Sequence, residues 1–180
     1  MAILVARAVW ESGVHALTRE QATELYEGRI QNWKQLGGEE RPVKFFEIAH
    51  GHGVWELFAG WLYHEARKAP AVKWETVTDG ADAQNAVHFN SGAASVAPLR
   101  WADGKEAMAL ALRDETGTAI EPTPSNIAAG KYPLTRPAFI VFGDKPTGNK
   151  RKLLEFLLSA KGQALVAGND LLPTAALKAP

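Results

Sequence analysis

The amino-terminal third of the chain alternates between apolar runs and stretches in which apolar residues recur at helical spacing. Residues 2–8 and 43–48 are runs with few polar interruptions, a pattern typical of strands buried on both faces of a parallel sheet. Residues 18–26 and 54–65 place apolar side chains three or four positions apart, which predicts amphipathic helices. The order strand, helix, strand, helix predicts an α/β fold with a mostly parallel sheet and flanking helices.

The first of these helices has a well-defined start and stop. Thr18 and Gln21 have the spacing of a capping box, and Leu17 before the cap can pack back on the first turns as a hydrophobic staple. Gly28 is expected to end the helix, and Trp33 offers a large apolar anchor in the loop that follows. The apolar stripe of the helix consists of Ala22, Leu25 and Tyr26.

The rest of the chain predicts further short elements without an internal repeat. In chain order they are a link over residues 10–15, an extended segment 72–76, a helix 81–89 capped by Asp79, strands 92–97 and 107–112, a short helix 125–129, a buried strand 138–142 and an amphipathic helix 150–159, interrupted at Gly162 and continued for another turn or two over 163–167.

Composition narrows the classes of function. The 180 residues include 20 basic and 20 acidic side chains, and this zero net charge argues against a nucleic-acid-binding surface. Cysteine is absent, which excludes disulfides, thiolate metal ligands and a thiol nucleophile. No apolar run approaches the roughly 18 residues of a membrane span, and the amino end lacks the basic and apolar regions of a signal peptide.

No catalytic constellation is visible in the sequence. The nucleophile elbow, the phosphate-binding P-loop and the paired-histidine helix of zinc proteases are all missing. The sequence therefore predicts that the chain is not an enzyme, with no catalytic residues and no cofactor.

Four segments resemble, in the same order along the chain, the phosphate-type solute-binding proteins of ABC uptake systems. They are residues 26–38, with the pattern Tyr-x-Gly-x-Ile-x-Asn-Trp-x-x-Leu-Gly-Gly, residues 122–127, residues 132–137, reading YPLTRP, and residues 156–163, reading FLLSAKGQ. The resemblance implies a periplasmic-binding-protein-like fold of type II, an α/β architecture. It also implies non-covalent capture of a small ligand, for which an oxyanion is the expected class.

The same resemblance implies how the chain is divided. Residues 1–180 would form one binding-protein-like domain, with 1–10 and 132–180 as part of a first lobe and 11–131 as the second lobe. The family has a further amino-terminal stretch before the strand that Ile3 begins, and that stretch supplies much of the first lobe. Another chain could supply it, the sequence could be a piece of a longer protein, or the protein could be a short form. An apolar surface left open in this way favours a homodimer.

The resemblance also places the ligand site, at the turn that enters the helix beginning near residue 54. The family carries an arginine and then Gly-Ser-Gly-Thr, so that backbone N–H groups, hydroxyls and a guanidinium face the anion. Here the arginine falls on Ile48, the serine on His52 and the threonine on Val54. Glu47 brings a negative charge next to this turn. The candidate ligand-binding residues are His50, Gly51, His52, Gly53, Val54 and, from the family segment that matches 92–96, Ser95.

Three interpretations of His50 and His52 stay open: ordinary loop residues, a turn that faces a ligand, and a pair that shares a metal with Glu47 or Glu56. Two histidines without a clear third ligand are weak evidence for zinc, and no metal site is predicted. Arg136 is expected to be a structural residue that ties the crossover.

Two functions from different classes follow. The first is a solute-binding protein that works with an ABC transporter permease and is periplasmic or extracellular in its mature form, although the chain alone is also compatible with the cytoplasm. The alternative is an interaction or regulatory module that kept the fold and lost the ligand. Burial of His50 and His52 against protein would favour the module, and an open polar cleft would favour binding.

Overall fold

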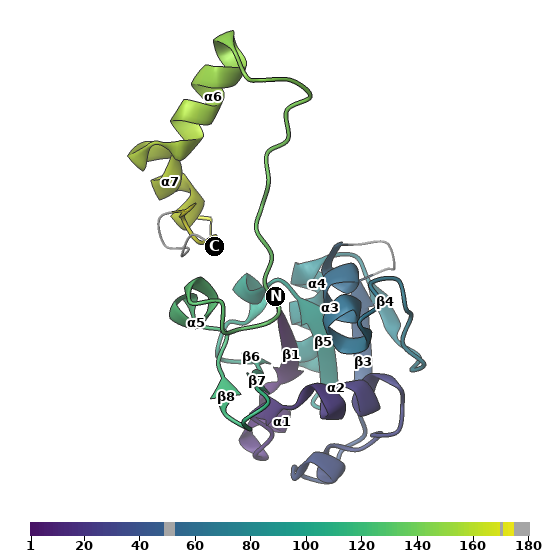
Figure 1. Ribbon diagram of the computed structural model, residues 1–180. Coiled ribbons are helices and arrows are strands. Elements are labelled where there is room, and N and C mark those ends of the chain that lie inside the picture. Colours follow the sequence, from purple (N-terminus) through teal and green to yellow (C-terminus); the bar gives the residue numbers. More distant parts are fainter. Residues whose placement is uncertain (49–52, 170, 175–180) are drawn as a thin grey trace.

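The computed structural model describes residues 1–48, 53–169 and 171–174, and it has a compact body and a carboxyl-terminal arm (Figure 1). A five-stranded sheet forms the centre of the body. Its strands are, in spatial order, β4 (Glu75–Val77), β3 (Lys44–Ile48), β5 (Ala93–Ala97), β1 (Ala2–Ala6) and β6 (Ala107–Ala109).

The α/β class is confirmed, but the sheet is more mixed than the apolar runs predicted. Strand β3 runs parallel to β4 and β5, whereas β1 runs antiparallel to β5 and β6. The prediction that residues 2–8 form a parallel strand was therefore wrong in direction and in length. An apolar run records burial on both faces, and burial is the same for either strand direction.

Helices and a small second sheet surround this centre. The α-helices are α1 (Arg7–Glu11), α2 (Arg19–Tyr26), α3 (Gly53–Tyr63), α4 (Gly80–Phe89), α5 (Pro124–Ala128), α6 (Gly148–Leu158) and α7 (Ala160–Ala167). Two short 3-10 helices are η1 (Trp33–Leu36) and η2 (Leu99–Trp101). The second sheet consists of β2 (Ala16–Leu17), β7 (Ala111–Arg113) and β8 (Ala119–Ile120). Helices α2 and α3 pack on each other, and α4 packs on β3, β5 and β1. Among the helices in the described ranges, none is long and apolar enough to cross a bilayer.

The local signals read from the sequence are mostly confirmed. Thr18 accepts from the Gln21 amide and Gln21 accepts from the Thr18 amide, which completes the capping box of α2. Asp79 caps α4. Trp33 is fully buried, and its indole N–H donates to the carbonyl of Gly92 at 3.0 Å.

Three boundaries differ from the prediction. The expected link over residues 10–15 begins with the end of α1, and the third extended segment is shifted to β4. The single strand predicted over 107–112 is two strands, because the chain passes at Leu110 from the large sheet to the small one. Leu110 is fully buried. The apolar run therefore has no polar break where the chain changes sheets, and the sequence pattern does not show two strands.

The predicted buried strand 138–142 is the largest error. This segment is an extended connection between the body and α6, and Phe139 and Val141 are 80% and 87% exposed. Figure 1 shows it leaving the body beside the amino terminus and leading to α6 and α7, which lie apart from the sheet. An apolar run forms a buried strand only where a neighbouring strand exists, and no described residue pairs with this one.

The helices of the arm follow the predicted amphipathic pattern but divide at Ser159 and not at Gly162. The Ser159 hydroxyl caps α7 by accepting from the Gly162 amide at 3.2 Å. A Cβ on Gly162 would lie 2.2 Å from the carbonyl oxygen of Phe156, so this glycine lets α7 begin close to the end of α6.

One acidic side chain lies inside the core. Glu47 of β3 is 3% exposed; it accepts from the Tyr26 hydroxyl at 2.7 Å and from the Val96 amide at 3.1 Å. Burial raises the pKa of Glu47 to about 8, against a smaller lowering by these two hydrogen bonds. The folded protein therefore holds this carboxyl in its neutral form at neutral pH.

Because the Glu47 carboxyl is buried, we expect the free energy of unfolding to fall as the pH rises from 4.5 to 8. The pKa of Glu47 in the folded state lies above its ordinary value of 4.5. The folded state thus binds more protons than the unfolded state across this window, and the contribution is lost by about pH 8. The slope of the free energy of unfolding should approach about 1.4 kcal/mol per pH unit. In Glu47→Gln, which imitates the neutral acid, urea unfolding between pH 5 and pH 8 should show a much smaller slope; an unchanged slope would contradict the assignment.

A second prediction concerns the close approach at Gly92. A Cβ at this position would lie 2.2 Å from the backbone carbonyl oxygen of Pro42, which cannot move aside cheaply. Gly92→Ala should lower the free energy of unfolding by about 1–3 kcal/mol in urea titrations. Gly143 has no heavy atom within 4 Å of the same position, so Gly143→Ala is the matched control and should stay within about 0.5 kcal/mol of the parent.

Candidate functional site

The amino end of α3 is the structural element on which the predicted ligand site rests. Strand β3 ends at Ile48 and α3 begins at Gly53. Predicted site residues His50, Gly51 and His52 lie outside the described residues. Gly53 and Val54 form the first turn of the helix, so their N–H groups belong to the set that has no acceptor within the helix. The positive end of the helix dipole lies at this turn.

Arg136 lies against this helix end. A Cβ on Gly53 would be 2.8 Å from both terminal nitrogens of the Arg136 guanidinium and 3.1 Å from its central carbon. Only glycine lets the guanidinium approach the helix backbone this closely. The two residues are 83 positions apart in the sequence, so the fold alone brings them together.

The chain before Arg136 is fixed in the body. Tyr132 and Leu134 are buried at 1% and 0% exposure, and the amino group of Met1 donates to the Leu134 carbonyl at 2.9 Å. Burial, with a smaller contribution from the charge of Arg136, lowers the pKa of the Met1 amino group to about 6. These contacts hold the backbone near residue 136 beside the start of β1 while the side chain reaches α3.

The guanidinium itself is available to a ligand. Arg136 is exposed, and it makes no hydrogen bond or ion pair with another residue in the described part of the chain. The interpretation of Arg136 as a tie for the crossover is therefore not supported by any contact of that kind. A planar guanidinium beside free helix N–H groups can bind an oxyanion with two parallel hydrogen bonds.

Glu47 does not oppose an anion in the way that its sequence position predicted. Its carboxyl is neutral at neutral pH, and its two oxygens accept from Tyr26 and Val96 within the core. The hypothesis of a negative charge beside the turn was wrong because the side chain of Glu47 points into the protein. The sequence gives no signal for this, since a charged residue in a strand can lie on either face.

Ser95 lies at the centre of the large sheet, opposite Leu4 of β1. Its hydroxyl is fully buried and finds no hydrogen-bond partner among the described residues. The part of Ser95 in a ligand site stays a prediction. The described residues contain no cluster of three His, Asp or Glu side chains spaced for a metal ion.

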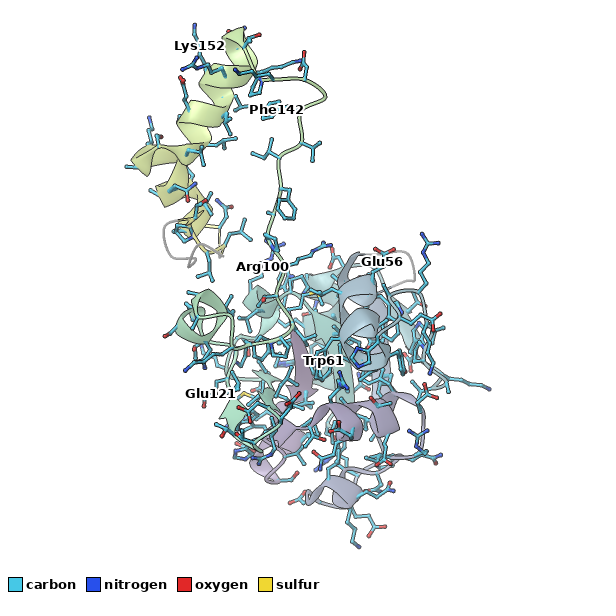
Figure 2. All side chains as sticks on the ribbon, viewed as in Figure 1. Glu56, Trp61, Arg100, Glu121, Phe142 and Lys152 are labelled. Carbon is cyan, nitrogen blue, oxygen red and sulfur yellow. The ribbon has the colours of Figure 1, made fainter. Side chains whose placement is uncertain are left out.

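The aromatic residues of α3 are packing residues. Trp55 is 5% exposed and lies with Phe58 against the ring of Tyr26, and Trp61 lies against Phe58. Figure 2 labels Trp61 on this helix, with Glu56 near the amino end. This cluster fixes α3 on α2, so the helix end that faces Arg136 has a rigid base.

Comparison with known proteins gives one family. The model of the PBP superfamily domain matches residues 2–161. A phosphate-binding protein PstS from Staphylococcus saprophyticus is 25% identical over 158 residues, which are 84% of this chain and 48% of that protein. Another PstS, from Bacillus subtilis, is 20% identical and is covered to 54%. The chain thus spans about half the length of these curated relatives.

Solved structures agree with this result. The crystal structure of a phosphate ABC transporter substrate-binding protein from Clostridium perfringens, with bound phosphate, superimposes with a TM-score of 0.79 at 25% identity. The match covers 96% of this chain and 68% of that one. A phosphate transport receptor from Vibrio cholerae gives a TM-score of 0.76 at 25% identity, with 95% and 68% covered. The chain therefore belongs to the PBP superfamily, in its branch of phosphate-type solute-binding proteins.

Proposed function

We propose that the chain captures a tetrahedral oxyanion, with phosphate as the first candidate, between the amino end of α3 and the Arg136 guanidinium. The observation that carries the proposal is the approach of this guanidinium to Gly53. In the family pattern an arginine stands before the turn, at the position of Ile48 here. Arg136 would provide the same positive charge from another segment of the chain.

Charge and geometry support an anion over other small ligands. The first turn of α3 offers backbone donors and the positive end of the dipole, and Arg136 adds a full charge without a described partner. Glu47 is buried and neutral at neutral pH, and Glu56 in the first turn of α3 makes no ion pair with Arg136. His52 and Val54 replace the two family hydroxyls, so fewer side-chain donors are available and weaker binding than in a complete family site is expected.

The proposed function is binding without catalysis. The relatives are named as phosphate-binding and transporter substrate-binding proteins, and none of those names describes an enzyme. Delivery to an ABC transporter permease, and a periplasmic or extracellular location of the mature protein, belong to the same proposal. The interaction module that lost its ligand is not favoured, because the helix end keeps its glycine and gains a guanidinium.

A thermal-shift titration tests the proposal. Phosphate, sulfate and molybdate are added separately at millimolar concentration, and a ligand at 100 times its dissociation constant adds about 2.7 kcal/mol, which corresponds to several degrees. Arg136→Ala should abolish the shift and Arg136→Lys should weaken it, since lysine cannot form the bidentate contact. Gly53→Ala should also weaken it, because the new methyl group displaces the guanidinium.

Arg67 provides the matched control, since it is exposed and follows the opposite end of α3. Arg67→Ala should keep the full shift. His52→Ala should lose part of it if the turn contributes a donor. No shift with any of the anions, or a shift that survives Arg136→Ala, would contradict capture at this helix end.

A further inference from the structure

The candidate site lies at one edge of the large sheet, where two further elements begin. Strands β4, β3 and β5 are neighbours and run parallel, so their carboxyl ends lie along the same edge. Strand β3 leads to α3, β4 leads to α4, and β5 leads to the 3-10 helix η2. Helix η2 therefore begins beside the helix end at which we propose that an anion binds.

The segments that carry Arg100 and Arg136 meet at this edge. The last residue of β5 pairs with the first residue of β1, and the amino group just before β1 donates to the Leu134 carbonyl at 2.9 Å. Arg100 lies three residues after β5, and Arg136 lies two residues after Leu134. Both arginines therefore belong to the same end of the body. Figure 2 labels Arg100 at this end, as it does Glu56 in the first turn of α3.

The side chain of Arg100 is held against Trp101. Its guanidinium carbon lies 5.3 Å from the centre of the indole ring, within the range of a cation–π contact. The indole is fixed in turn by α4, because a Cβ on Gly80, the first residue of that helix, would overlap the pyrrole edge of the ring. The start of α4 thus sets the position of the indole, and the indole sets the position of the exposed positive charge.

No carboxylate holds the Arg100 guanidinium. In the described part of the chain this guanidinium makes neither an ion pair nor a hydrogen bond, and its N–H groups are open to an anion. The acidic residues beside it accept N–H groups of their own turns. Asp79 caps α4, Asp82 accepts from the Thr78 amide, and Asp103 accepts from the three amides of residues 105–107 at 2.8–3.0 Å.

A second arginine at this edge acts on the charge of a ligand more than on its shape. Coulomb energy scales with the product of the two charges, so a doubly charged anion gains twice as much from one guanidinium as a singly charged anion of the same shape. The effect extends beyond hydrogen-bonding distance, because the Debye length is about 8 Å at physiological salt and longer at low salt. Sulfate and perchlorate are both tetrahedral oxyanions and differ in charge, so together they separate charge from shape.

We propose that Arg100, positioned by Trp101, is a second cation of the anion site and determines its preference for doubly charged over singly charged oxyanions. This inference rests on the proposed function, since it names the class of anion that the same site prefers. Arg136 contacts the anion at the start of α3, whereas Arg100 acts through its charge from the end of the neighbouring strand.

Isothermal titration calorimetry of the full chain with sulfate and with perchlorate, at one pH and matched low ionic strength, tests the proposal. Arg100→Ala should weaken perchlorate binding about 2-fold and sulfate binding about 4-fold, because the factor lost by the dianion is the square of the factor lost by the monoanion. Arg100→Lys keeps the charge and should keep the ratio of the two dissociation constants. Arg67→Ala, at an exposed position beyond the opposite end of α3, is the matched control and should change neither constant.

Two variants of Trp101 test whether the indole positions the charge. Trp101→Leu removes the ring face on which the guanidinium lies, so its preference for sulfate should fall toward that of Arg100→Ala. Trp101→Phe keeps a ring face beside Gly80 and should keep most of the preference. Far-ultraviolet circular dichroism of each variant should match the spectrum of the parent.

The outcomes separate this inference from the proposed function. If Arg100→Ala weakens both anions by the same factor, or weakens neither, while Arg136→Ala abolishes binding, the role of Arg100 is overturned and capture at α3 stands. A parent protein that binds phosphate but not sulfate would also overturn it, because a preference set by charge requires that a doubly charged tetrahedral anion binds. A parent protein that binds no anion would overturn both proposals.

Discussion

The hydrogen bonds of one buried carboxyl join β3, β5 and α2, and α3 packs on two of these elements, α2 and β5. Strands β3 and β5 pair through Phe45 and Ala94, and two residues later the side chain of Glu47 takes the place of a backbone acceptor for the Val96 amide. Its other oxygen accepts from Tyr26 of α2. Glu47 therefore bridges β3, β5 and α2 just before the chain leaves the sheet for α3. In open α/β sheets, ligands bind in the crevice outside the carboxyl ends of the strands, at the point where the strand order reverses.

The protonation state of Glu47 also affects which charges lie near the start of α3. Glu47 is held neutral at neutral pH, so the acidic side chain at the start of α3 is Glu56 in the first turn of that helix, and it makes no ion pair with Arg136. The aromatic cluster of Tyr26, Trp55 and Phe58 fixes α3 on α2, so the helix dipole is held in one direction. In the proposed site, a helix end held in this way would lose little entropy on binding an anion.

The segment that supplies Arg136 also begins the arm, and this links the candidate site to the exposed apolar surface. Leu134 is buried, and its carbonyl accepts a hydrogen bond from the Met1 amino group. Phe139, five residues later, is 80% exposed. The superposition on the Clostridium perfringens structure includes 96% of this chain and leaves about a third of that protein without a counterpart. The unpartnered surface of the arm is in keeping with that difference in length.

The sequence by itself determined the local features, because each depends on neighbouring residues. The capping box of Thr18 and Gln21, the cap at Asp79 and the amphipathic spacing of α6 are encoded within a few positions. The order of the family segments also determined the fold class and the superfamily. These are the parts of the structure for which propensity, pattern and tertiary contacts agree.

The tertiary structure alone decided strand direction, side-chain orientation and contacts between distant segments. Apolar runs record burial without direction or partner, so the sequence did not show that β1 is antiparallel or that residues 138–142 pair with no described strand. Glu47 was predicted to bring a negative charge next to the turn, since only the folded sheet places its side chain inside. The pairing of Arg136 with Gly53 could not be found from the sequence, because their distance depends on how residues 54–135 fold between them.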